Sequence, residues 1–314
     1  MLNLETYKSN TARDMKETKL SVNSDQFILD CRNEAQKAIE AATKKDGSLN
    51  WSKLPKLIGQ NTKIKKAVAH NENELEIWGL SLAPHWVSGF NTCSSFSGEC
   101  ASSCLMFCGM GQKFMVASDG KHKVAIARIV RTILWFKFKD QFKAKLLREI
   151  ENKAKLLKSK NVDMAFRPNV FSEIKFEKLF PELFTLCEKL SISVYDYVKD
   201  IKRITNNPIK NYNMTFSLSE NNALFIPTAL KYGCNIAVVS DIPLNKNKDR
   251  TYKFNPPKYL EIEGIKLETI DGDQHDARFL DLKQNCFVVL RGKGQTIRKG
   301  KTGGFMRHVE LQAC

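Results

Sequence analysis

The strongest constraint on the fold is an alternation of strand-like and helical segments from residue 75 onward. Short apolar runs bounded by turn residues predict seven strands, at 75–82, 162–166, 192–197, 213–218, 235–240, 265–270 and 286–290. Apolar residues at helical spacing occupy the segments 124–157, 176–190 and 223–232. Strands that are separated by helices usually pair in parallel, as βα units. The pattern therefore predicts an α/β fold with a mostly parallel sheet.

Such a sheet is either doubly wound or curled into a barrel. No Gly-x-Gly-x-x-Gly motif follows the first strand, so we expect a partial or open (βα) barrel, TIM-like in its repeat. The chain has 314 residues, of which 42% are hydrophobic, and this is enough for one barrel-sized core. We assign residues 71–314 to this domain. Residues 1–70 are polar and rich in lysine, and we expect them to form a helical N-terminal extension.

Four of the nine cysteines fall within sixteen residues and predict a metal centre. Cys93, Cys100, Cys104 and Cys108 have the spacing C-x6-C-x3-C-x3-C. The paired C-x2-C knuckles of structural zinc sites are absent, which favours an iron–sulfur cluster, most simply 4Fe-4S. Zinc is the alternative metal, and unligated thiols are a third interpretation. Three ligating thiolates would leave one iron open to a substrate, whereas four would close the site.

The cellular environment is expected to be the cytoplasm, with no membrane partner. No run of about 18 uncharged apolar residues occurs along the chain. The first residues lack the basic and then apolar layout of a signal peptide. Clustered cysteines in a reducing compartment bind metals more often than they form disulfides.

The charge distribution predicts an anionic partner. The formal net charge is +16, and residues 121–160 hold thirteen Lys or Arg against three acids. The segment 291–308 is also basic and is rich in glycine. Positive surfaces of this kind attract nucleic acids and other anions. The alternative interpretation is a solvated basic helix that only keeps the protein soluble.

Polar side chains follow the predicted strands, where the active sites of (βα) barrels lie. For proton transfer we predict three catalytic acids, namely Asp196, Asp271 and Asp273. The predicted substrate-binding residues, suited to an anionic group, are Arg167, Asn169, Lys199, Ser217, Ser219, Arg291 and Lys293. Asp271, Asp273 and Asp276 also resemble a loop for a divalent metal. The alternative is that these side chains are polar only because strand ends adjoin surface loops.

Several short motifs resemble one family of phage proteins, grouped as the gene product eighty-eight family. The motifs that carry the resemblance are 80–93, Cys100-x3-Cys104, Gly109-x-Gly111, Ala127-Arg128-Ile129-x2-Thr132, Arg167-x-Asn169, Tyr195-Asp196-Tyr197-x-Lys199, 271–279 and 290–294. The resemblance covers roughly residues 75–310. It implies a phage origin, and hence the cytoplasm of a host cell, and a site built on the first three cysteines. It implies no particular reaction.

A looser resemblance is to the radical S-adenosylmethionine enzymes, in which three cysteines lie in the loop after the first strand of a partial (βα) barrel. The placement of Cys93, Cys100 and Cys104 is similar. The spacing C-x6-C-x3-C differs from the usual C-x3-C-x2-C of those enzymes. This resemblance implies S-adenosylmethionine as a candidate cosubstrate.

Two functions from different classes follow from these patterns. The first is a radical S-adenosylmethionine-like iron–sulfur enzyme that acts on an anionic substrate, such as a nucleotide or a nucleic-acid base. The alternative is a non-enzymatic protein in which a metal staples the cysteine loop and the basic segments bind nucleic acid. A metal-assisted hydrolase centred on the loop 271–276 is a third hypothesis.

Overall fold

A computed structural model describes residues 22–61, 64, 68–70, 73–104, 123–242, 245–246, 252–292 and 304–307. The strands are β1 Ile58–Gly59, β2 Val68–His70, β3 Asn73–Leu80, β4 Val162–Arg167, β5 Ser193–Val198, β6 Tyr212–Ser217, β7 Ile236–Ser240, β8 Asn245–Lys246, β9 Tyr252–Lys253, β10 Tyr259–Ile262, β11 Ile265–Asp271, β12 Phe287–Arg291 and β13 Met306–Arg307. The helices are α2 Val22–Ala42, η1 Trp51–Lys53, α3 Gly98–Ser102, α5 Lys123–Lys137, α6 Lys139–Lys158, α7 Phe176–Leu179, α8 Pro181–Lys189, α9 Ile201–Thr205, η3 Ala223–Phe225, α10 Ile226–Lys231 and η4 Arg278–Leu280.

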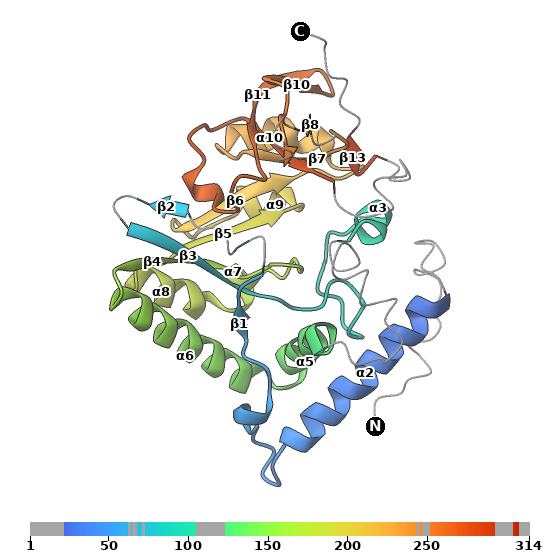
Figure 1. Ribbon diagram of the computed structural model, residues 1–314, viewed down its shortest axis with the longest axis vertical. Coiled ribbons are helices and arrows are strands. Elements are labelled where there is room, and N and C mark those ends of the chain that lie inside the picture. The colour runs from blue at the N-terminus through green and yellow to red at the C-terminus, as the bar shows by residue number, and fades with distance from the viewer. Residues whose placement is uncertain are drawn as a thin grey trace.

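One mixed sheet runs through the molecule (Figure 1). Within the described residues it has 11 strands, nine of them in the order β1-β3-β4-β5-β6-β7-β12-β11-β10, with β2 on β3 and β13 on β7. The pairings from β3 through β4, β5, β6, β7 and β12 to β11 are all parallel. These seven strands are the seven that the sequence predicts. The prediction of a mostly parallel α/β sheet is confirmed.

The sheet stays open instead of closing into a barrel. At one end β1 pairs antiparallel with β3, and at the other end β10 pairs antiparallel with β11. β3 to β7 are neighbours in chain order, but β12 lies between β7 and β11. A closed eight-stranded barrel would instead join its first strand to its last. The sheet is therefore open, and the TIM-like barrel form that the sequence predicts is not confirmed.

Helices cover one face of this sheet, and α5, α6 and α8 lie together below β3 and β4 in Figure 1. The long amphipathic segment predicted at 124–157 is two helices, which meet at Phe138. Buried Ile129 and Ile133 on α5 and Phe142 and Leu146 on α6 recur every four residues. This spacing places them on one stripe of each helix. Their burial against the sheet forms the main core.

The other face of the sheet has a smaller core of its own. Because side chains alternate along a strand, Phe166 on β4 belongs to the main core while its neighbour Ala165 belongs to the second one. Ile77 and Tyr195 extend the second core across β3 and β5, and Ala277 from the β11–β12 connection packs on them. That connection therefore fills part of the face that the helices leave uncovered.

The N-terminal helix α2 joins the main core. Its buried residues Ile28, Ala35 and Ile39 belong to the same cluster as α5, against which the helix packs. Arg32 on α2 donates hydrogen bonds to the carbonyl oxygens of Val87 and Trp86, each at 2.7 Å. The described part of residues 1–70 is thus tied to the segment that follows β3. Within the described residues, no helix is both long and apolar enough to span a membrane.

Gly79 gives a direct test of this packing. A Cβ atom added at Gly79 would lie 2.5 Å from Val170 Cγ2 and 3.1 Å from the Arg167 carbonyl oxygen. Its partner across the β1–β3 pair, Gly59, has nothing within 4 Å of such an atom. We expect Gly79→Ala to lower the free energy of unfolding by about 1–3 kcal/mol in urea titrations, because overpacking forces neighbours to shift. Gly59→Ala is the matched control, and equal effects of the two substitutions would contradict this packing.

Candidate functional site

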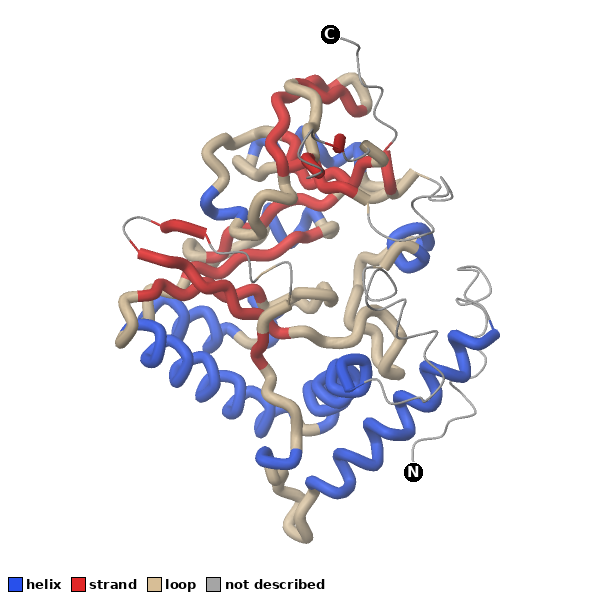
Figure 2. Tube along the Cα trace, viewed as in Figure 1, coloured by secondary structure: helices blue, strands red, loops and turns tan. Residues whose placement is uncertain are grey.

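A cavity of about 190 Å³ lies at the carboxyl ends of the parallel strands. Cys93, Cys100 and Cys104, all free thiols, line it. So do six of the residues predicted from the strand ends, namely Arg167, Asn169, Lys199, Ser217, Asp273 and Arg291. The structure therefore brings three predicted ligands and six predicted polar residues to one cavity. The loop that carries the cysteines leaves β3 and runs beyond the strand ends to α3 (Figure 2).

Cys93 is held at the cavity by the segment that follows β4. Cys93 forms an isolated parallel β-bridge with Glu173, and the Glu173 N–H donates to the Thr92 carbonyl oxygen at 2.7 Å. The Glu173 carboxylate accepts the N–H of Lys199 at 2.6 Å and that of Asp200 at 3.3 Å. Glu173 is buried, with 4% of its surface exposed. One residue, through its backbone and its side chain, therefore links the cysteine loop to the end of β5.

The second anchor of the loop holds α3, which carries Cys100. Ser97 caps the helix by accepting the Cys100 N–H. Glu220, which follows β6, accepts the Ser97 hydroxyl at 2.6 Å and the Glu99 N–H at 3.1 Å. A carboxylate at this end of the helix also interacts favourably with the unpaired amide groups there. Cys100 is thus positioned from β6, and Cys93 from β4 and β5.

Cations and N–H groups surround the thiols. Burial raises the pKa of the Cys93 thiol, while the His85 N–H at 3.2 Å and Lys199 act in the opposite direction. Burial alone would lower the pKa of Lys199, but Cys100 and its other anionic neighbours hold it above its ordinary range. Lys199 and Cys100 both line the cavity. The net effect is a raised pKa for the Cys93 thiol, so Lys199 and the His85 N–H offset only part of the cost of burying a thiolate there.

The arrangement of ligands does not match a single ion. Among the residues that the structure describes, no three His, Cys, Asp or Glu side chains could hold one metal ion together. Three thiolates on one zinc would lie only about 4 Å apart, since each Zn–S bond is about 2.3 Å. Asp271, Asp273 and Asp276 likewise form no such group. Cys108 and Lys293, two of the predicted site residues, lie outside the described residues.

Asp196, predicted as a catalytic acid, lies away from the cavity wall. It is fully buried and accepts hydrogen bonds from Asn169 N–H at 3.1 Å, Asn169 Nδ2 at 2.8 Å and the Tyr212 hydroxyl at 2.7 Å. Burial raises its pKa, although Arg167 and Arg203 oppose this. Every partner is a group of the protein itself. The surroundings of Asp196 thus favour a structural role, and its catalytic role stays a prediction.

The remaining predicted acids and serines also divide into residues that line the cavity and residues that do not. Asp273 lines the cavity and accepts the Arg291 N–H at 3.2 Å. Asp271 is half-buried outside the lining and accepts the Asp273 N–H at 2.8 Å, so it shapes the turn. Ser219 is buried outside the lining, where its N–H donates to Asn222 Oδ1.

Some residues of the site were not predicted from the sequence. Arg167 is held by Asp276 at 2.8 Å, and Tyr197, whose ring lies 4.7 Å from the Arg167 guanidinium, completes that wall. Arg128 on α5 stacks over the ring of Phe171, a lining residue, at 4.0 Å. Arg128 stands in one of the sequence motifs, and that motif was the only signal for it. No spacing rule links a residue of α5 to Phe171, which lies beyond the next helix and strand of the chain.

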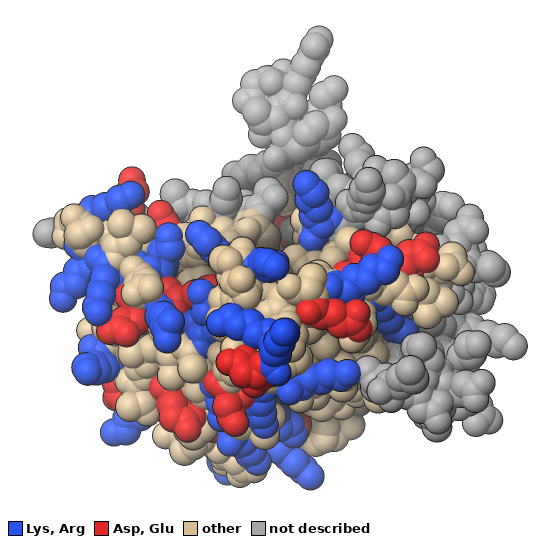
Figure 3. Space-filling view, turned by 90° about the horizontal axis from the view of Figure 1, so that it is seen from below, with Lys and Arg blue, Asp and Glu red and all other residues tan. Residues whose placement is uncertain are grey.

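The predicted basic surface is less uniform than its composition suggests. On α6, Lys145 pairs with Glu149 at 3.3 Å and Lys155 with Glu151 at 2.9 Å. Lys153 lies 4.0 Å above the Trp78 ring. Figure 3 shows Lys and Arg interspersed with Asp and Glu on the face viewed there. Of the predicted basic tail, only 291–292 and 304–307 are described, and a nucleic-acid partner stays a prediction.

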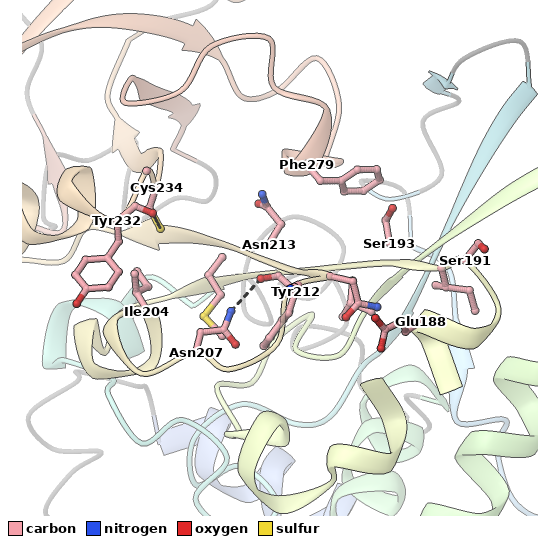
Figure 4. A pocket seen from close by; sticks show the side chains of 16 residues that line it. Glu188, Ser191, Ser193, Ile204, Asn207, Tyr212, Asn213, Tyr232, Cys234 and Phe279 are labelled. Atoms are coloured by element: carbon pink, nitrogen blue, oxygen red, sulfur yellow. Dashed lines mark hydrogen bonds between the residues drawn. The ribbon is translucent and has the colours of Figure 1, made fainter. Parts of the chain in front are cut away.

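A larger cavity, of about 650 Å³, opens at the opposite ends of the same strands. Figure 4 shows Ser193 and Asn213 on the same side of β5 and β6 as Phe279, with Asn207 on the other side. Asn207 Nδ2 donates to the Tyr212 carbonyl oxygen at 3.2 Å. None of the predicted site residues that the structure describes lines this cavity. The chemistry-bearing residues therefore gather at the carboxyl ends.

Fold and site together define an α/β protein whose open parallel sheet carries a cysteine-lined cavity at its strand ends. The model of one family, described as Gene product 88, matches residues 53–308. The chain belongs to the Gene product 88 family, which confirms the family resemblance seen in the sequence. Neither the curated proteins nor the solved structures gave a significant match. The looser resemblance to radical S-adenosylmethionine enzymes gains no support from these comparisons.

The structural role of Asp196 can be tested by substitution. Asp196→Ala would leave Asn169 and Tyr212 with buried, unsatisfied donors, so we expect a loss of about 3–5 kcal/mol in the free energy of unfolding. Asp271→Asn is the control, because an amide oxygen can still accept the Asp273 N–H, and we expect it to cost less than about 1 kcal/mol. Urea titration measures both. A fully stable Asp196→Ala protein would contradict the structural role.

The anchor at α3 predicts a local effect. Glu220→Ala removes the acceptor of the Ser97 hydroxyl and the Glu99 N–H. We expect faster hydrogen–deuterium exchange in residues 97–104 and a global loss of about 1–2 kcal/mol, the usual size of a lost cap. Glu261→Ala, at an exposed position on β10, is the control. Unchanged exchange in 97–104 would show that Glu220 does not hold the loop.

Proposed function

We propose that the cavity at the strand ends is the active site of an iron–sulfur enzyme. Cys93, Cys100 and Cys104 would hold a 4Fe-4S cluster, and its fourth iron would face an anionic substrate or cosubstrate. The observation that carries the proposal is that these three thiols share one cavity with Lys199 and Arg291 and with the other polar groups at the strand ends.

The cavity that the three thiols share supports a cluster over a single ion. In a four-iron cluster each thiolate binds a different iron, so the ligands lie farther apart than three ligands of one zinc. The described thiols line one cavity without forming a group for a single ion. A cavity of about 190 Å³ has room for a compact inorganic group and a small part of a ligand.

The electrostatics of the cavity also support this proposal. A cluster binds thiolates, and Lys199 and the His85 N–H both stabilise negative charge on sulfur. When bound, such a group supplies one-electron transfer to a ligand at its open iron. Arg291 and Asp273, farther along the lining, are suited to hold a charged substrate group and to move a proton.

S-adenosylmethionine is the first cosubstrate to test. The cysteine loop follows the first parallel strand, and β3 to β7 are neighbours in chain order, as in the partial barrels of the enzymes that use it. The cysteine spacing differs from theirs, so the proposal of an open iron does not depend on this cosubstrate. A non-enzymatic protein stapled by metal is the alternative that the same measurements address.

Metal analysis of protein purified without oxygen tests the proposal. We expect about four irons and four sulfides per chain. Serine substitution of Cys93, Cys100 or Cys104 removes one ligand, so we expect each variant to lose most of this iron. Cys234→Ser is the control, because Cys234 is half-buried outside this cavity. Spectra that change on addition of S-adenosylmethionine would identify the cosubstrate.

Two outcomes would contradict the proposal. Stoichiometric zinc without sulfide would make the loop a structural staple. Equal iron in the wild type and in all three serine variants would show that the thiols are not ligands. Salt-dependent binding of DNA that survives Cys93→Ser would favour the non-enzymatic alternative.

A further inference from the structure

Lys199 lies among the thiols instead of facing only a substrate. It follows the last residue of β5, is half-buried, and lines the same cavity as Cys93, Cys100 and Cys104. Cys100, Glu173 and Cys93 raise its pKa against the effect of burial. The Glu173 carboxylate holds its backbone N–H at 2.6 Å, and Asn222 Nδ2 holds its carbonyl oxygen at 3.4 Å. The backbone that carries this cation is therefore fixed at the cavity that the cysteines line.

Arg128 approaches the same cavity from the helix layer. It projects from α5, its guanidinium lies 4.0 Å above the ring of Phe171, which lines the cavity, and Cys104 opposes the effect of burial on its pKa. Its Nε is buried and has no hydrogen-bond partner in the part of the chain that the structure describes. An arginine stays charged in proteins, and a buried charge is costly unless an opposite charge lies near it. A thiolate at Cys104 would supply that opposite charge.

From this arrangement we infer that Lys199 and Arg128 are positioning residues that balance the negative charge of the thiolate-bound cluster and set its reduction potential. The inference rests on the proposed function. Reduction adds one negative charge to the cluster, and nearby fixed cations favour the more negative state. Both residues therefore raise the reduction potential. Lys199 acts from the strand ends and Arg128 from the helix layer.

Spectroelectrochemical titration of the full-length protein, purified without oxygen, tests this inference. We expect Lys199→Met to shift the reduction equilibrium of the cluster roughly tenfold toward the oxidised form, which is about 59 mV for one electron. Arg128→Gln should shift it in the same direction. Lys199→Arg keeps the charge and should restore most of the wild-type potential. Lys202→Met, at an exposed lysine on α9, is the control and should leave the potential unchanged.

The outcomes separate this inference from the proposed function. Wild-type protein without iron and sulfide would overturn both. A loaded wild type with unchanged potentials in Lys199→Met and Arg128→Gln would overturn the charge-balancing role alone. If Lys199→Met folds but loses the cluster, retention of the cluster in Lys199→Arg supports the inference. Loss in both Lys199 variants, with circular dichroism unchanged, would contradict it, because the charge alone would then not suffice.

Discussion

The cavity depends first on the hydrogen bonds of Glu173. Its backbone N–H meets the Thr92 carbonyl oxygen at 2.7 Å, and its carboxylate accepts the Lys199 N–H at 2.6 Å. Through these bonds one buried residue fixes Cys93 on the loop and the cation at the end of β5. A buried carboxylate without a hydrogen-bond partner would be costly. Both N–H groups that the Glu173 carboxylate accepts, those of Lys199 and Asp200, belong to the segment directly after β5. The same contacts that satisfy Glu173 therefore assemble the site.

One face of the sheet carries the main core, and the other face carries the cavity. Side chains alternate along β5, so Tyr195 and Tyr197 face the β11–β12 connection and contact Asp276. Asp196 points to the face covered by helices, where Tyr212 binds it. The helix-covered face holds the main core together with this buried polar network. On the other face, the cavity lies at the carboxyl ends of the strands, beyond the second core.

Much of this arrangement was predictable from the sequence. Apolar periodicity located all seven parallel strands, and the cysteine spacing singled out one loop after the first of them. The rule that parallel strands align their carboxyl ends correctly gathered Arg167, Lys199 and Arg291 with the cysteines. Asp196 differs because it lies inside the strand, which was predicted to end at 197 and ends at Val198. The acid is therefore an internal strand residue, and its parity points it away from the cavity.

Contacts between distant segments could not be predicted from a single sequence. Asp276 looked like part of a metal loop, yet it pairs with Arg167 across 109 positions of the chain. Arg128 belongs to a helix, and nothing in the spacing of α5 shows that it reaches Phe171. Glu220 accepts the N–H of Glu99 on α3, which lies 121 residues earlier in the chain. Such contacts depend on how the layers pack, which periodicity does not encode.

Diffraction at the iron absorption edge, from crystals grown without oxygen, would locate a cluster in the cavity. We expect one anomalous peak inside the cavity, which resolves into a cluster bound by the sulfurs of Cys93, Cys100 and Cys104. One iron should lack a protein ligand. A cavity without iron in protein that was never exposed to oxygen, or a single zinc on the loop, would contradict the proposed iron–sulfur site.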